Sequence, residues 1–122
     1  MKFLAPSVAL TAMLIALPVQ AQRSLSIQAR TAGDLAELCA ANPKDAQGDA
    51  KINFCHGFAQ GAITVELRHS DGKKPFCIPS PAPNRTTTMN EFVGWVRSTP
   101  NHRGVPAADG LFQFLGGRFP CK

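Results

Sequence analysis

Apolar residues recur at intervals of three and four positions in four separate stretches of the chain. This spacing places them on one face of an α-helix, whereas a half-buried strand would alternate apolar and polar residues. No stretch of the chain sustains such alternation. The sequence therefore predicts an all-α fold, a small bundle of about four helices. The predicted apolar faces are Leu35, Leu38 and Cys39; Ile52, Cys55, Phe58, Ala59, Ala62 and Ile63; Met89, Phe92, Val93 and Val96; and Ala108, Leu111, Phe112 and Leu115.

Capping and helix-breaking residues set the expected boundaries of these helices. Thr31 precedes Asp34 by three positions, and Thr88 precedes Glu91 by the same interval. Each pair has the spacing of a capping box, so we expect helices to start at both threonines. The pair Gly116–Gly117 is expected to end the last helix, because glycine is common just after a helix.

The longest predicted helix runs from about Asp49 to about Arg68 and contains two glycines four residues apart. Gly57 and Gly61 lie on one side of this helix. Each costs about 1 kcal/mol relative to alanine in a helix interior. We expect a second helix to cross closely over this smooth surface; the alternative is a helix that is simply weak.

A long connection, residues 69–85, follows this helix. It contains Asp71-Gly72, four prolines and Cys77. A loop of this length inside a small domain needs an anchor. A disulfide at Cys77 would supply it.

The first 21 residues have the layout of a secretory signal peptide. Lys2 precedes an apolar run from Val8 to Leu17, and Val19 and Ala21 occupy the −3 and −1 positions of a cleavage site after Ala21. The run is shorter than the roughly 20 apolar residues of a membrane span. We therefore expect an exported, periplasmic protein without a membrane anchor in its mature form.

The mature chain would be one small basic domain. Removal of 21 of the 122 residues leaves 101, which suit a single domain with a thin core. We expect residues 22–33 to form a flexible lead-in and residues 34–122 to form the helical domain. Without Lys2, 12 basic and 8 acidic residues give a net charge of +4. No run of basic residues exceeds two, so nucleic acid is not expected as a partner.

The four cysteines, Cys39, Cys55, Cys77 and Cys121, all lie in the mature chain. An even number in a short exported protein predicts two disulfides, with three pairings open. Cys39 falls near the end of the first helix and Cys55 in the first turns of the second, so an antiparallel hairpin would bring them together. This favours Cys39–Cys55 and leaves Cys77–Cys121, which would tie the proline-rich connection to the C-terminus.

No arrangement of polar residues in the sequence is typical of an active site. His56, His69 and His102 each lack a second metal ligand four residues away, and the carboxylates are spread singly. Neither a Gly-x-Ser-x-Gly turn nor a glycine-rich phosphate loop is present. We therefore expect no enzymatic activity, no catalytic or metal-binding residues and no cofactor. The expected function is binding.

The cysteine contexts together resemble the Rap/Tai family of periplasmic immunity proteins. The resemblance covers roughly residues 34–121, nearly the whole mature chain. The motifs that carry it are Leu38-Cys39, Cys55-His56-Gly57-Phe58-x-x-Gly61, Phe76-Cys77-Ile78-Pro79 and Phe119-Pro120-Cys121.

The resemblance implies a small, all-helical, disulfide-containing and non-catalytic protein that is often dimeric. It further implies that the protein neutralises a peptidoglycan amidase effector, delivered by a type VI secretion system, by occluding the active site of that enzyme. The alternative is a periplasmic stress or acid chaperone-like small helical protein. The eight carboxylates and two restraining disulfides argue against an acid-triggered opening.

Two regions are candidates for contact with a partner protein. Trp95 lies off the apolar stripe of its helix, and Arg68, His69, Lys73 and Lys74 gather where the long connection begins. For Trp95 the alternative is ordinary core packing. For the connection the alternative is a loop that the disulfide anchors and that binds nothing.

Overall fold

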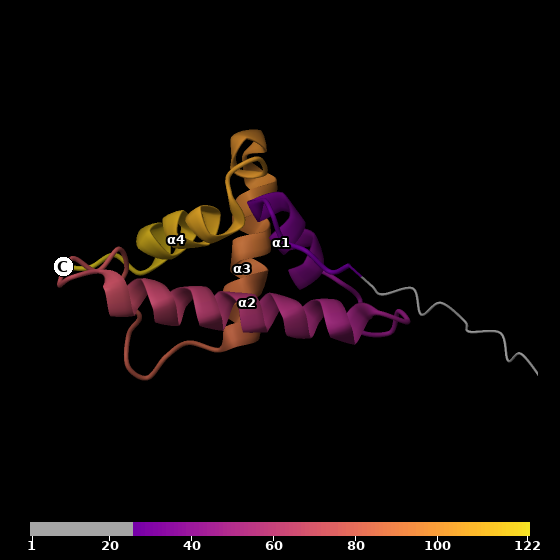
Figure 1. Cartoon of the computed structure of the whole chain (residues 1–122), viewed down its shortest axis with the longest axis horizontal. Helices are drawn as coiled ribbons and strands as arrows, with labels where there is room; N and C mark the ends of the chain where they lie inside the picture. The colour runs from indigo at the N-terminus through magenta and orange to yellow at the C-terminus, as the bar shows by residue number, and fades with distance from the viewer. Residues whose placement is uncertain (1–25) are drawn as a thin grey trace, which may run out of the picture.

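The computed structural model describes residues 26–122 of the chain. The predicted signal peptide, residues 1–21, and the start of the predicted lead-in lie outside the described residues. Within residues 26–122 there are four α-helices, one short 3-10 helix and no β-strand, so the predicted all-α fold is confirmed (Figure 1). The helices are α1 (Ala32–Cys39), α2 (Gly48–His69), α3 (Arg85–Ser98), η1 (Pro100–His102) and α4 (Ala107–Arg118).

The shortest α-helix, α1, lies at the centre of the bundle and contacts α2, α3 and α4. In Figure 1, α2 runs along one side, α3 stands steeply to it, and α1 and α4 lie on the same side of α2. Ala32, Leu35 and Ala36 of α1 are fully buried. The core also includes Phe76 from the long connection and Phe119 from the chain after α4. Segments outside the helices therefore help to close a core that four short helices alone would leave open.

The predicted start of α1 is confirmed. The Thr31 hydroxyl accepts a hydrogen bond from the Asp34 amide at 3.1 Å, and the Asp34 carboxylate accepts one from the Thr31 amide at 3.0 Å. This reciprocal pair is a capping box. It satisfies amides at the helix start that have no partner within the helix.

The predicted start of α3 at Thr88 is wrong, because the helix begins one turn earlier, at Arg85. The Asn84 side chain caps it by accepting a hydrogen bond from the Thr87 amide at 3.1 Å. The Thr88 hydroxyl lies inside the first turn and donates to the Asn84 carbonyl at 3.1 Å. Asparagine is as good a helix cap as threonine, and its position one turn upstream lengthens the helix.

The predicted end of α4 at Gly116–Gly117 is also wrong. The helix continues through both glycines to Arg118, and the Phe119 amide donates to the Leu115 carbonyl at 2.7 Å. Glycine permits a helix to end but does not force it to do so. Here the buried side chain of Phe119, four residues after buried Leu115, continues the apolar face of the helix.

The predicted close helix crossing at Gly57 and Gly61 is not present. Both glycines are exposed, and a Cβ atom added at either would meet nothing within 4 Å. The close crossing lies between α1 and α4 instead. A Cβ atom built on Gly110 would lie 2.6 Å from the Cβ atom of Ala32. The absence of a side chain at Gly110 is therefore what lets α4 approach the central helix.

Both predicted disulfides are confirmed. We call Cys39–Cys55 the hairpin disulfide, because it joins the end of α1 to the early part of α2, with a Cα–Cα distance of 5.2 Å. We call Cys77–Cys121 the tail disulfide, because it joins the long connection to the C-terminal tail, with a Cα–Cα distance of 4.9 Å. A loop of about 15 residues closed in this way stabilises the folded state by about 3 kcal/mol. None of the described helices combines the length and apolar composition needed to cross a bilayer.

Candidate partner-binding surfaces

Trp95 is half-buried at the edge of the core. Its indole lies 6.2 Å from the ring of Phe92 and 6.1 Å from the ring of Phe114, measured between centroids. The imidazole of His102 covers another part of it, with 3.7 Å between ring centroids and 10° between ring planes. Trp95 thus packs against the core, which is the alternative that we set against contact with a partner. It also contacts His102 in the turn that follows α3.

This turn forms what we call the α3–η1 tip, residues 95–104. The Nδ1 atom of His102 lies 2.9 Å from the carbonyl oxygen of Trp95, and the His102 amide donates to the Thr99 carbonyl at 3.0 Å. The Arg103 amide donates to the Pro100 carbonyl at 3.3 Å. In Figure 1 the end of α3 and the turn after it project beyond α1 and α4. The tip is therefore a projecting turn held in one conformation by stacking and hydrogen bonds.

The base of the tip is attached to α1. The Glu37 carboxylate lies 3.6 Å from the guanidinium of Arg97 and 3.7 Å from that of Arg103. These pairs are exposed, so each contributes little stability by itself. Two hydrogen bonds add to them: the Gly33 amide donates to the Arg103 carbonyl at 3.0 Å, and the Ala32 amide donates to the Val105 carbonyl at 2.7 Å. The Arg103 carbonyl of the tip and the Val105 carbonyl directly after the tip thus accept hydrogen bonds from two amides of the first turn of α1, which have no partner within the helix.

The four predicted basic contact residues lie together at the C-terminal end of α2. Arg68 and His69 are in the last turn of the helix, and Lys73 and Lys74 follow it; all four are exposed. We call residues 68–74 the basic turn. Its reversal is made by Asp71 and Gly72, which have φ angles of 45° and 82°. Cations at the end of a helix interact favourably with its macrodipole.

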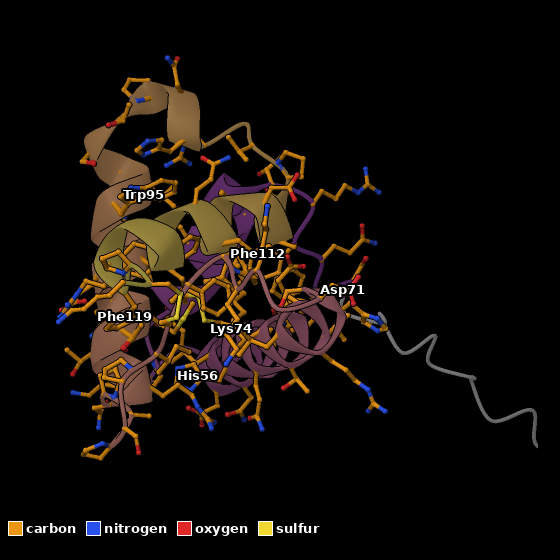
Figure 2. All side chains as sticks on the ribbon, turned by 90° about the vertical axis from the view of Figure 1, so that its left-hand side faces the viewer. His56, Asp71, Lys74, Trp95, Phe112 and Phe119 are labelled. Carbon is orange, nitrogen blue, oxygen red and sulfur yellow. A yellow bond between two sulfur atoms is a disulfide. The ribbon has the colours of Figure 1, made fainter. Side chains whose placement is uncertain are left out.

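Trp95 and the basic turn are not parts of one surface. Trp95 lies on α3 toward the tip, whereas Lys74 and Asp71 lie at the level of α2 (Figure 2). The tip follows the C-terminal end of α3, and the basic turn follows the C-terminal end of α2. Because the two helices stand steeply to one another, their ends point to different sides of the molecule (Figure 1). A partner that contacts both must reach around the bundle.

A groove that the sequence did not indicate lies between α2, the long connection and the start of α3. Its volume is about 190 Å³. The floor is apolar and formed by residues from α2, α3, α4 and the tail, namely Ala59, Met89, Leu111, Leu115 and Phe119. Polar side chains of α2 and α3 stand along its rim. The helical period of α2 did place Ala59 and Ile63 on one face, but the sequence could not show that the connection borders a groove at that face.

Among residues 26–122, two ionisable groups have clearly shifted pKa values, and both belong to helix ends. A hydrogen bond from the backbone of Thr31 is the main cause that lowers the pKa of the Asp34 carboxyl. A hydrogen bond from Nε of Arg118 to the Glu91 carboxylate, at 2.8 Å, raises the pKa of the guanidinium and links α4 to α3. Within residues 26–122 no three His, Cys, Asp or Glu side chains gather as a metal site would require.

Comparison with known proteins gives one match. The model of the family described as Rap1a immunity proteins matches residues 31–121, which is most of the chain and nearly all of its described part. No curated protein and no solved structure matches the chain.

Proposed function

The chain belongs to the Rap1a immunity protein family, and from this premise we propose that it protects its cell from a peptidoglycan amidase delivered by a type VI secretion system. Family membership implies an immunity-like binding protein with a protein effector as its partner. We further propose that the protein acts in the periplasm, after cleavage behind Ala21, and that it inhibits the amidase by occluding the active-site groove.

The observation that carries the occlusion mechanism is the rigid, projecting α3–η1 tip. A segment that enters a groove must project, and this one does (Figure 1). A segment already held in its bound conformation loses little entropy on binding. The 3.7 Å stack of Trp95 on His102 and the attachment of Arg97 and Arg103 to Glu37 provide that restraint. Arginine is also among the residue types that dominate binding energy at interfaces, and Arg97 and Arg103 are exposed on the tip.

We assign the basic turn, with Arg68, His69, Lys73 and Lys74, to a second contact with the same effector, on a different side of the bundle from the tip. The side chains of the basic turn are exposed and charged, so they contribute to long-range attraction rather than to tight packing. Charges of this kind mainly change the association rate and its dependence on salt. A homodimer, which the family resemblance also implies, stays a prediction that sedimentation equilibrium can check.

The test begins with the oxidised protein immobilised as bait. Periplasmic and secreted extracts of the source cells are passed over it, and the retained proteins are identified by mass spectrometry. We expect one cell-wall amidase, and we expect the purified protein to abolish its release of peptides from peptidoglycan at a ratio of one binding site per enzyme. Retention of many unfolded proteins would instead favour the stress-chaperone alternative. An amidase that binds but stays active would refute occlusion.

Matched variants locate the inhibitory surface. Asn101→Trp adds a bulky side chain at the exposed tip, and Asn53→Trp makes the same change at an exposed position of α2. We expect only the tip variant to weaken inhibition, by at least about tenfold, which corresponds to 1.4 kcal/mol of binding free energy. Equal effects of the two variants, or an effect of Asn53→Trp alone, would place the interface elsewhere.

A further inference from the structure

The groove is bordered by the long connection, whose path the tail disulfide helps to fix. The tail disulfide fixes the connection at Cys77, and the Cys77 amide donates to the Phe119 carbonyl at 2.8 Å. Pro79, Pro81 and Pro83 restrict the backbone of the segment that borders the groove. The attachment at Cys77 and the three prolines limit how far this side of the groove can move.

The size and lining of the groove suit a small apolar group. Its volume is about 190 Å³. A cavity of about 150 Å³ lined by apolar side chains is large enough to hold benzene. The floor residues Ala59, Leu111 and Leu115 offer no hydrogen-bonding side chains. The apolar part of a ligand would therefore be about the size of one aromatic ring with a short chain attached.

The rim of the groove carries positive charge without a neighbouring acid. Among the lining residues Arg85 carries a positive charge, and none is Asp or Glu. Arg85 is the first residue of α3, and no acidic residue lies in the first turn of this helix. The start of a helix carries partial positive charge, which acidic side chains normally balance. An arginine at this position increases the positive potential instead. Within the described residues, no carboxylate forms a salt bridge with Arg85.

We propose that this groove binds a small anionic amphiphile, a compound with one apolar body of ring size and one carboxylate. The apolar body occupies the floor between α2 and α4, and the carboxylate lies at the rim near the guanidinium of Arg85 and the start of α3. Guanidinium groups bind carboxylates through charge-assisted hydrogen bonds, which are about twice as strong as neutral ones. This site is separate from the α3–η1 tip and does not depend on the identity of the effector.

The test is a titration of the oxidised, exported protein, labelled with ¹⁵N, with 4-phenylbutyrate, and in parallel with the neutral 4-phenylbutan-1-ol. We expect saturable amide shifts confined to the groove, with a Kd of about 1 mM for the carboxylate, as the ligand efficiency of a compound of this size suggests. We expect the alcohol to bind about fivefold to tenfold more weakly, because it lacks the charge-assisted contact.

Three variants separate the two parts of the proposal. Arg85→Gln should weaken the carboxylate about fivefold to tenfold and leave the alcohol unchanged. Lys74→Gln removes the same charge from the basic turn and should change neither affinity. Ala82→Leu fills the groove from an exposed position of the connection and should weaken both ligands without unfolding the protein.

Three results would overturn the proposal. The first is the absence of saturable binding by either ligand. The second is equal affinity for acid and alcohol, which would show that the negative charge of the ligand does not contribute to binding. The third is binding that Ala82→Leu and Arg85→Gln leave unchanged, because the ligand would then lie outside the groove.

Discussion

Replacement of Gly110 by alanine tests which glycines position the helices of this bundle. The new Cβ atom would lie 2.6 Å from the Cβ atom of Ala32 on α1. Carbon atoms in favourable contact are about 3.5–4.0 Å apart, so α1 and α4 must separate by about 1 Å. Both Cβ atoms are bonded directly to the backbone, so no side-chain rotation relieves the contact.

The expected cost follows from two opposing effects. Overpacking in a well-packed core costs up to about 3 kcal/mol. Replacement of a helical glycine by alanine stabilises the helix by about 1 kcal/mol. We therefore expect Gly110→Ala to lower the free energy of unfolding by about 2 kcal/mol. In a domain of this size that corresponds to a fall in Tm of about 8–16 °C.

The matched control is Gly61→Ala, in the middle of α2. A Cβ atom there meets nothing within 4 Å, so only the gain in helix propensity remains. We expect an increase in stability of about 0.5–1 kcal/mol. Urea unfolding of the oxidised protein, followed by circular dichroism at 222 nm, measures both changes. Gly110→Ala at or above wild-type stability would refute the assignment of the close crossing, as would a loss of stability in Gly61→Ala.

Three further predictions concern pH, redox and fluorescence. Because the pKa of Asp34 is lowered in the folded state, its stabilising effect is complete above the ordinary carboxyl pKa and is lost as the pH falls through the lower, folded-state value. In Asp34→Asn, the free energy of unfolding should therefore fall less steeply below about pH 4 than in the wild type. Urea unfolding at a series of pH values measures this, and an unchanged pH dependence would contradict it. The tail disulfide, whose two cysteines are exposed, should be reduced before the hairpin disulfide, one of whose cysteines is fully buried. Timed reduction with alkylation and peptide mass spectrometry gives the order, and the reverse order would refute it. His102→Ala should shift the emission of the single tryptophan, Trp95, to longer wavelength by exposing one face of the indole, whereas His69→Ala should not; equal spectra for the two variants would show that the stack does not shield Trp95.

The sequence was sufficient wherever a feature depends on residues close together in the chain. Helical spacing of apolar residues identified all four α-helices, since a helix buries one face at a fixed period. The capping box at Thr31 was readable because both of its hydrogen bonds join residues three positions apart. The hairpin disulfide was predictable for a similar reason, because a short loop between two helices brings its cysteines together.

The tertiary structure alone decided which faces meet. The neighbouring sequence of a helical glycine does not reveal whether another helix crosses it. The predicted crossing at Gly57 and Gly61 was therefore wrong, and the close contact lies at Gly110. The stack of His102 on Trp95 joins residues whose contact depends on the direction in which the chain leaves α3. The groove depends on the path of a loop held by a disulfide to a residue 44 positions away. Local physics specifies the helices, and the long-range packing of their side chains specifies the surfaces available for binding.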